Sequence, residues 1–190
     1  MNKNKLEIRS MTTVEATEDM IVEGYALKFN SLSENFGNWR EIILPEALTH
    51  TDLSDVRCLF DHDKSKVLGR TTANTLQINA DDVGLHIRCQ LPNTTYARDL
   101  YESIQRGDIN QMSFGFYLAD GGDKFTKDKE SGGYIRTLTS IEKIYDVSIV
   151  AIPAYSDTNI AVAQRNLELV EDECKRQREI LMLQLDLLKY

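Results

Sequence analysis

The chain has 190 residues and a formal net charge of −8, with 42% hydrophobic and 27% charged residues. This composition is typical of a globular domain with a sizeable core and an appendage. The negative charge, without any block of lysine and arginine, argues against binding of nucleic acid. The apolar runs are too short to cross a bilayer, and no apolar segment of a secretory signal follows the first lysines. We therefore expect an intracellular protein that binds neither nucleic acid nor membrane.

Cysteine and histidine spacing gives no sign of a metal site. Cys58, Cys89 and Cys174 are widely separated and lack C-x-x-C spacing, which predicts free, mostly buried thiols in a reducing compartment. The three histidines show no zinc-type spacing either. The chemistry predicted below requires neither a metal nor a cofactor.

Residues 6–154 have the pattern of short strands separated by turns. Gly24 lies inside the first of these strands and predicts a bulge or bend there. Pro45 suits the first turn of a short helix, and Thr94 or Thr95 can cap a longer helix that ends at Gly107. The polar connection 119–133 has the composition of a mobile surface loop. Strands are predicted at 21–29, 41–44, 56–60, 75–79, 85–91, 109–118, 134–144 and 145–152, with a hairpin turn at 80–84.

The composition changes after about residue 158. Residues 166–190 contain no glycine or proline and predict a long amphipathic helix, so we divide the chain into a domain at 1–160 and a helical segment at 161–190. Two interpretations of this segment remain open: it binds a partner or a second copy of the chain, or it is removed by self-cleavage after about Ala161. The apolar seam is formed by Leu167, Val170, Cys174, Leu181 and Leu188, and Gln177 and Gln184 interrupt it.

Ser113 is the first candidate nucleophile. Strand alternation over 111–118 points its hydroxyl to the face opposite the apolar side chains of Met112, Phe114 and Phe116, with Gly115 leaving its flank open. We therefore expect Ser113 on a solvated face that a substrate can reach. A strand serine on such a face is also common in proteins without activity, so this pattern does not identify a catalytic residue.

A serine hydroxyl needs a base to take its proton, and a third group that orients that base. His62 follows the strand 56–60 directly, a typical place for a functional side chain, although a solvated histidine in a turn has the same pattern. Strand geometry points Asp61 and Asp63 away from it. Asp146 lies inside an apolar strand, where a carboxylate needs a partner, and a structural aspartate bonded to backbone amides explains this equally well.

Six motifs together resemble the prohead (capsid maturation) serine protease family of tailed phages. They occur in family order over residues 5–163. The motifs are Glu23-Gly-Tyr-Ala-Leu-Lys-Phe29, Leu59-Phe-Asp-His-Asp63, Val67-Leu-Gly-Arg-Thr71, Asp82-Val-Gly-Leu85, Ile109-Asn-Gln-Met-Ser-Phe-Gly-Phe116 and Tyr145-Asp-Val-Ser-Ile-Val-Ala-Ile-Pro-Ala-Tyr155.

The resemblance implies a mainly β fold of the α+β class, a compact antiparallel β-barrel of the herpesvirus-protease type with helices around it. It implies Ser113 as nucleophile, His62 as general base and Asp146 as third member, where many relatives have glutamate. Herpesvirus relatives use a second histidine there, which makes His86 a rival for that place. The implied function is cleavage of the scaffold segments of capsid precursors, and of the protease itself, by serine acyl-enzyme chemistry inside the assembling procapsid in the host cytoplasm. The implied partners are the capsid precursor and scaffold protein.

Two other functions remain open at this stage. A non-catalytic β-barrel that binds capsid or scaffold protein needs the same core but no convergence of Ser113 with His62. The other is a different hydrolase on a β-barrel that acts on an ester or a glycan, and a carboxylate-pair glycosidase would use acids such as Glu23 or Asp61. Arg70 could support an oxyanion-binding loop, although an exposed structural arginine explains it better.

Overall fold

The computed structural model describes residues 6–17, 19–152, 171–173, 175–182 and 184. The chain divides into two units, Met1–Tyr155 and Ser156–Tyr190, and each is described by itself. The elements of the first unit are β1 (Leu6–Ala16), β2 (Ile21–Lys28), β3 (Trp39–Ile43), η1 (Pro45–Leu48), β4 (Arg57–Phe60), β5 (Asp63–Arg70), η2 (Thr71–Ala73), β6 (Leu76–Ala80), β7 (Gly84–Gln90), α1 (Thr95–Gln105), β8 (Gln111–Leu118), β9 (Asp123–Lys127), β10 (Tyr134–Leu138) and β11 (Ile141–Val150).

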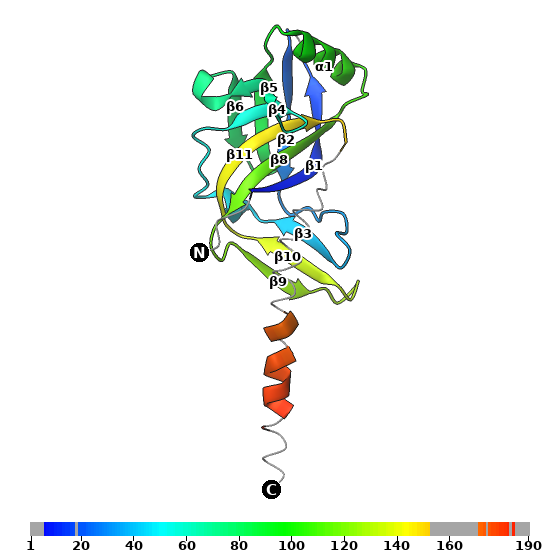
Figure 1. The fold of residues 1–190 in the computed structure, drawn as a ribbon, viewed down its shortest axis with the longest axis vertical. Helices are drawn as coiled ribbons and strands as arrows, with labels where there is room; N and C mark the ends of the chain where they lie inside the picture. The colour runs from blue at the N-terminus through cyan, green and yellow to red at the C-terminus, as the bar shows by residue number, and fades with distance from the viewer. Residues whose placement is uncertain (1–5, 18, 153–170, 174, 183, 185–190) are drawn as a thin grey trace. The chain divides into compact units, whose positions relative to one another are not determined.

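Eight of the strands form one curled sheet in the order β5-β4-β11-β8-β1-β2-β7-β6 (Figure 1). All neighbouring pairs are antiparallel except β4 and β11, which run parallel. The sheet curls until β5 contacts β7, so it is nearly closed. The strands β5 and β7 approach so closely that a Cβ on Gly69 would lie 2.5 Å from Cys89 Sγ. The predicted mainly β, barrel-like fold is confirmed.

The helix α1 covers one end of the curled sheet (Figure 1). Its buried residues Ala97, Leu100 and Ile104 follow the three- and four-residue spacing that places apolar side chains on one helix face. Gly107, with a φ of +81°, follows the helix as predicted and donates its N–H to the Ile104 carbonyl. Thr94 is the N-cap residue, but its hydroxyl makes no capping hydrogen bond.

The predicted strands differ from the structure in three details. The connection 119–133 is not simply a loop, since it contains β9. The predicted strand 134–144 is divided at Thr139 and Ser140 into β10 and the start of β11. The bulge predicted in β2 is present, between Tyr25 and Leu27. Gly24 itself is needed because β1 passes so close that a Cβ there would meet the Thr13 carbonyl oxygen at 2.5 Å. The strands β1 and β5 were not among the predicted strands.

Cys58 and Cys89 are buried free thiols, as the sequence predicts. A hydrogen bond with Cys89, together with burial, raises the pKa of the Cys58 thiol well above its ordinary value. Such a thiol is protonated and unreactive at neutral pH. Cys174 lies outside the described residues.

In the second unit, residues 171–173, 175–182 and 184 are helical, within the predicted amphipathic helix. Of the predicted seam, only Leu181 is described, and its side chain is 58% exposed. The predicted boundary at residue 160 also falls outside the described residues. No helix in the described part of the chain is long and apolar enough to cross a membrane.

A second sheet, in the order β3-β10-β9, is joined to β1 by buried charges. Arg136 on β10 donates hydrogen bonds to Glu7 on β1 at 2.6 and 3.0 Å, and to Glu41 on β3 at 2.9 Å. Arg9 on β1 donates to both glutamates, and Asp123 on β9 also accepts from Arg136, at 2.6 Å. The cluster therefore links β1 to all three strands of the small sheet.

The two sides of this cluster stabilise each other's charged forms. Burial alone would raise the pKa of Glu7, but the hydrogen bonds and charges of Arg136 and Arg9 outweigh it and hold that pKa below its usual value. Burial likewise disfavours the Arg136 cation, and its carboxylate partners more than offset this effect, so the pKa of Arg136 is raised. Removing one partner would leave the opposite charge buried and uncompensated.

We expect Arg136→Met to lower the free energy of unfolding by about 3–5 kcal/mol, because Glu7 and Glu41 lose their main cation. Urea denaturation followed by tryptophan fluorescence measures this effect, since Trp39 packs beside the cluster. The matched control is Arg88→Met, which removes an ion pair with Glu23 from the surface and should cost less than about 1 kcal/mol. Equal effects of the two variants would contradict a structural role for the cluster.

Candidate active site

Ser113 and Asp146 come from adjacent strands and face the same side of the sheet. Strands β8 and β11 pair so that Ser113 lies opposite Ser148, and Gly115 lies opposite Asp146. The other face of β8 carries Met112, Phe114 and Phe116 into the core, as the alternation predicts. We call Ser113, Gly115, Asp146 and Ser148 the polar square.

A β-bulge in β11 turns Asp146 toward this face. The register changes between Ile144 and Asp146, so that Tyr145 is an extra residue in β11. With strict alternation Asp146 would point to the core together with Ile144. The bulge reverses the phase, and Val147 instead becomes the next core residue.

His62 reaches the polar square from a tight turn between β4 and β5. Phe60 pairs with Asp63, and the two residues between them, Asp61 and His62, have φ values of +51° and +56°. Positive φ at both central residues is the requirement of a type I′ hairpin turn, and it is uncommon for histidine. Asp61 ties the turn to the end of β11: its N–H donates to the Ile149 carbonyl, and its carboxylate accepts the Ala151 N–H, both at 2.9 Å.

The structure brings the three predicted site residues into one hydrogen-bonded chain. His62 Nε2 lies 2.6 Å from Ser113 Oγ, and His62 Nδ1 lies 2.6 Å from Asp146 Oδ2. If the serine hydroxyl donates to Nε2, then Nδ1 carries the ring proton and donates it to the carboxylate. This is the order of contacts that base activation of a serine requires.

The prediction that Ser113 lies on a solvated face was wrong. The exposed fraction of Ser113 is 0% and that of Asp146 is 2%, whereas the His62 side chain is 13% exposed. Gly115 leaves no open flank, because the Asp146 carboxylate fills the space above it. A Cβ on Gly115 would lie 2.4 Å from Asp146 Oδ1. Both faces of β8 are therefore buried, one by the core and the other by the site.

The other candidate residues have different partners. The His86 ring on β7 packs against the Tyr25 ring in a T-shaped arrangement, and β1 and β2 lie between β7 and β8 in the sheet. Arg70 binds Asp55 at 2.6 and 2.9 Å, as a structural arginine. Glu23 accepts a hydrogen bond from Arg88, whereas Asp61 accepts the Ala151 N–H at the end of β11. The two acids considered for a glycosidase therefore have separate structural partners.

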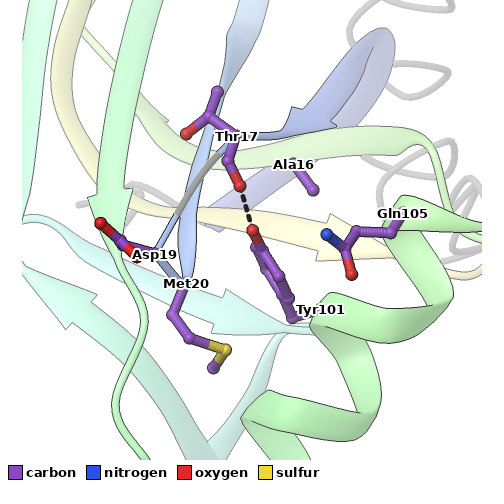
Figure 2. A pocket seen from close by; sticks show the side chains of 6 residues that line it. All are labelled: Ala16, Thr17, Asp19, Met20, Tyr101 and Gln105. Atoms are coloured by element: carbon purple, nitrogen blue, oxygen red, sulfur yellow. Dashed lines mark hydrogen bonds between the residues drawn. The ribbon is translucent and has the colours of Figure 1, made fainter.

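A pocket in the first unit lies between α1 and the turn from β1 to β2 (Figure 2). Tyr101 donates a hydrogen bond to the Thr17 carbonyl there. The pocket is lined by Ala16, Thr17, Asp19, Met20, Tyr101 and Gln105, so it includes none of the predicted site residues. Among the described residues, no group of three His, Cys, Asp or Glu side chains could hold a metal.

Ser148 is the site residue that sequence reasoning missed. Its hydroxyl donates to Asp146 Oδ2 at 2.6 Å, and its Oγ lies 3.1 Å from His62 Nδ1. A signal was present in the sequence: the apolar residues Ile144 and Val147 are three apart, a spacing that breaks strand alternation and indicates the bulge. With that phase change, Asp146 and Ser148 share a face.

A serine hydroxyl, an imidazole and a buried carboxylate in this order on a β-barrel have the arrangement of a serine peptidase site. The family model described as Caudovirus prohead serine protease matches residues 4–173. The chain therefore belongs to the Caudovirus prohead serine protease family.

Two individual proteins are similar to the chain. The prohead protease of Enterobacteria phage HK97 is 28% identical over 152 residues, which are 80% of this chain and 63% of that protein. The chain thus spans less than two thirds of the length of this relative. The capsid assembly protease of bacteriophage T4 shares the fold, with a TM-score of 0.50 and 10% identity over 78% of this chain and 98% of that one.

We expect Gly115→Ala to lower the free energy of unfolding by about 1–3 kcal/mol, because the new methyl group overlaps the Asp146 carboxylate. In an Asp146→Ala background the same substitution should lower the free energy of unfolding much less, since the space above Gly115 is then free. Urea denaturation of the four proteins gives the coupling between the two sites.

The control for this cycle is Gly121→Ala, whose Cβ would meet nothing within 4 Å although its φ is +68°. Gly121→Ala should change the free energy of unfolding by the same amount in the parent chain and in the Asp146→Ala background. An equal cost of Gly115→Ala in both backgrounds would show that the carboxylate does not occupy the space above Gly115.

Proposed function

We propose that the chain is a capsid maturation protease, a serine endopeptidase that cleaves capsid precursor or scaffold protein inside the procapsid in the host cytoplasm. The observation that carries the proposal is the chain of two 2.6 Å contacts from Ser113 through His62 to Asp146. Its occurrence in a member of the prohead serine protease family supports peptide bonds as the substrate.

In the proposed reaction, Ser113 Oγ attacks the peptide carbonyl carbon while His62 Nε2 accepts the hydroxyl proton. The C–N bond then breaks, and His62 returns that proton to the leaving amine, which gives an acyl-enzyme. Water attacks the ester in the second half, with His62 again as base, and frees Ser113. Asp146 holds the Nδ1 proton of His62 and offsets the charge of the imidazolium. Backbone N–H groups stabilise the oxyanion in such reactions.

Access to the nucleophile needs a local movement. Ser113 has no contact with solvent, and His62 is the most exposed member of the chain of contacts. A substrate carbonyl therefore reaches Ser113 Oγ only after side chains around it shift. Activity should therefore be measured with the capsid precursor as substrate. A small reagent added to the isolated chain would test access to Ser113 as well as its reactivity.

We also propose that the helical segment provides contacts with the capsid precursor, the scaffold or a second copy of the chain. The exposed apolar side chains of Ile180, Leu181 and Met182 support a role in binding. The alternative is that this segment is removed by self-cleavage.

Ser113→Ala and His62→Gln should each lower cleavage of the co-expressed capsid precursor by at least about 10³-fold, because each removes the nucleophile or its base. Gel densitometry of precursor and product over time measures the effect. His86→Gln is the matched control, and its cleavage rate should equal that of the unmodified chain. If the Ser113→Ala chain cleaves the precursor as the parent does, the proposed serine chemistry is wrong.

An intact-mass measurement distinguishes the two interpretations of the helical segment. If the chain removes this segment itself, overnight incubation converts the 21.7 kDa species into a lighter one, and Ser113→Ala stays intact because it lacks the nucleophile. A stable 21.7 kDa species in an active preparation would leave binding as the role of the segment.

A further inference from the structure

The buried hydroxyl of Ser148 lies where the histidine and the carboxylate of the site meet. Its Oγ donates to Asp146 Oδ2 at 2.6 Å and lies 3.1 Å from His62 Nδ1. The same carboxylate oxygen lies 2.6 Å from His62 Nδ1. The exposed fraction of Ser148 is 0%, so these contacts are protected from competition by water.

The backbone fixes this position. Ser148 is two residues after Asp146 on β11 and lies on the same face. It pairs directly with Ser113 on the neighbouring strand β8. It therefore belongs to the sheet that carries the proposed nucleophile, rather than to a mobile loop. A hydroxyl held in this way keeps its geometry while His62 gains and loses a proton.

We propose that Ser148 is a positioning residue of the site, acting through Asp146 and His62; the proposal rests on the function proposed above. The terminal torsion of an aspartate is broad, so a carboxylate with a single partner can rotate. The Ser148 hydroxyl gives Asp146 Oδ2 a second donor and thereby fixes the plane of the carboxylate. The fixed carboxylate in turn holds the His62 ring with Nε2 toward Ser113.

Ser148 also favours the tautomer that the reaction needs. Its own proton is donated to Asp146, so its lone pairs face the neighbouring Nδ1–H of His62 as a second, longer acceptor. Two acceptors at Nδ1 keep the proton there and leave Nε2 free to accept the Ser113 proton. Without the Ser148 hydroxyl, His62 Nδ1 retains Asp146 Oδ2 as its acceptor but loses the second one.

A proton NMR spectrum of the folded chain tests this role independently of catalysis. The Nδ1 proton of His62, held in a short buried hydrogen bond, should give a resonance downfield of the amide region, assigned by its loss in His62→Gln. Ser148→Ala should shift or broaden it, and Ser148→Thr, which keeps the hydroxyl, should restore it. An unchanged resonance in Ser148→Ala overturns the proposal.

Cleavage of the capsid precursor gives the second readout. Ser148→Ala should lower the turnover rate by roughly ten- to hundred-fold, the range for loss of one hydrogen bond to a charged group, with KM within about twofold of the parent. Ser148→Thr should recover most of that rate. The matched control is Ser65→Ala, whose hydroxyl donates to the exposed carboxylate of Asp63 at 2.6 Å, and it should cleave normally.

The outcomes separate the two proposals. If Ser113→Ala still cleaves, the proposed function fails, whereas the His62 resonance still reports on Ser148. If Ser113→Ala is inactive but Ser148→Ala cleaves like the parent, only the role of Ser148 fails. Should Ser148→Ala not fold, Ser148→Cys keeps a side chain of the same connectivity with a weaker donor, and its turnover should lie below that of Ser148→Thr; equal rates would overturn the proposal.

Discussion

The register between β8 and β11 is the constraint on which the site depends. Ser113 lies opposite Ser148 and Gly115 opposite Asp146, so one strand pair supplies both ends of the contact chain and the hydroxyl between them. A slip of one residue would exchange the faces of β11 and turn its carboxylate into the core. The bulge at Tyr145 sets this register, because it separates the alternation before Asp146 from the alternation after it.

His62 depends on the same strand, although it comes from a different part of the chain. The strand β4 runs parallel to β11, and the turn that carries His62 is attached to β11 through Asp61. The backbone of this turn lies in the left-handed region at two successive residues, which costs free energy for residues other than glycine. The contacts of Asp61 with Ile149 and Ala151 offset that cost. Both the base and the carboxylate are therefore held by β11.

The sequence was sufficient for much of the fold and for three site residues as candidates, because these follow from local pattern and from ordered motifs. Alternation in β8 correctly assigned Met112, Phe114 and Phe116 to the core. It could not tell whether the opposite face meets solvent or another layer, since that depends on His62, 51 residues away. For the same reason Ser148 was not identified from the sequence, since its partner His62 is 86 residues away. The buried charges of Glu7 and Arg136 join strands 129 residues apart and leave no local signal.

The Arg136 cluster and the candidate active site are both buried and polar, but they differ in how completely their charges are paired. This difference matches the role that each can have. Arg136 and Arg9 have charged partners on several strands, and this complete pairing suits a structural role. Asp146 is buried, and its Oδ2 lies 2.6 Å from both His62 Nδ1 and the Ser148 hydroxyl. The negative charge of Asp146 also contributes to the raised pKa of the Cys58 thiol. In a low-dielectric site such a charge stabilises a proton arriving on His62 more than water would. Under the proposed mechanism, the Asp146 carboxylate gains a charged partner when His62 takes the proton of Ser113.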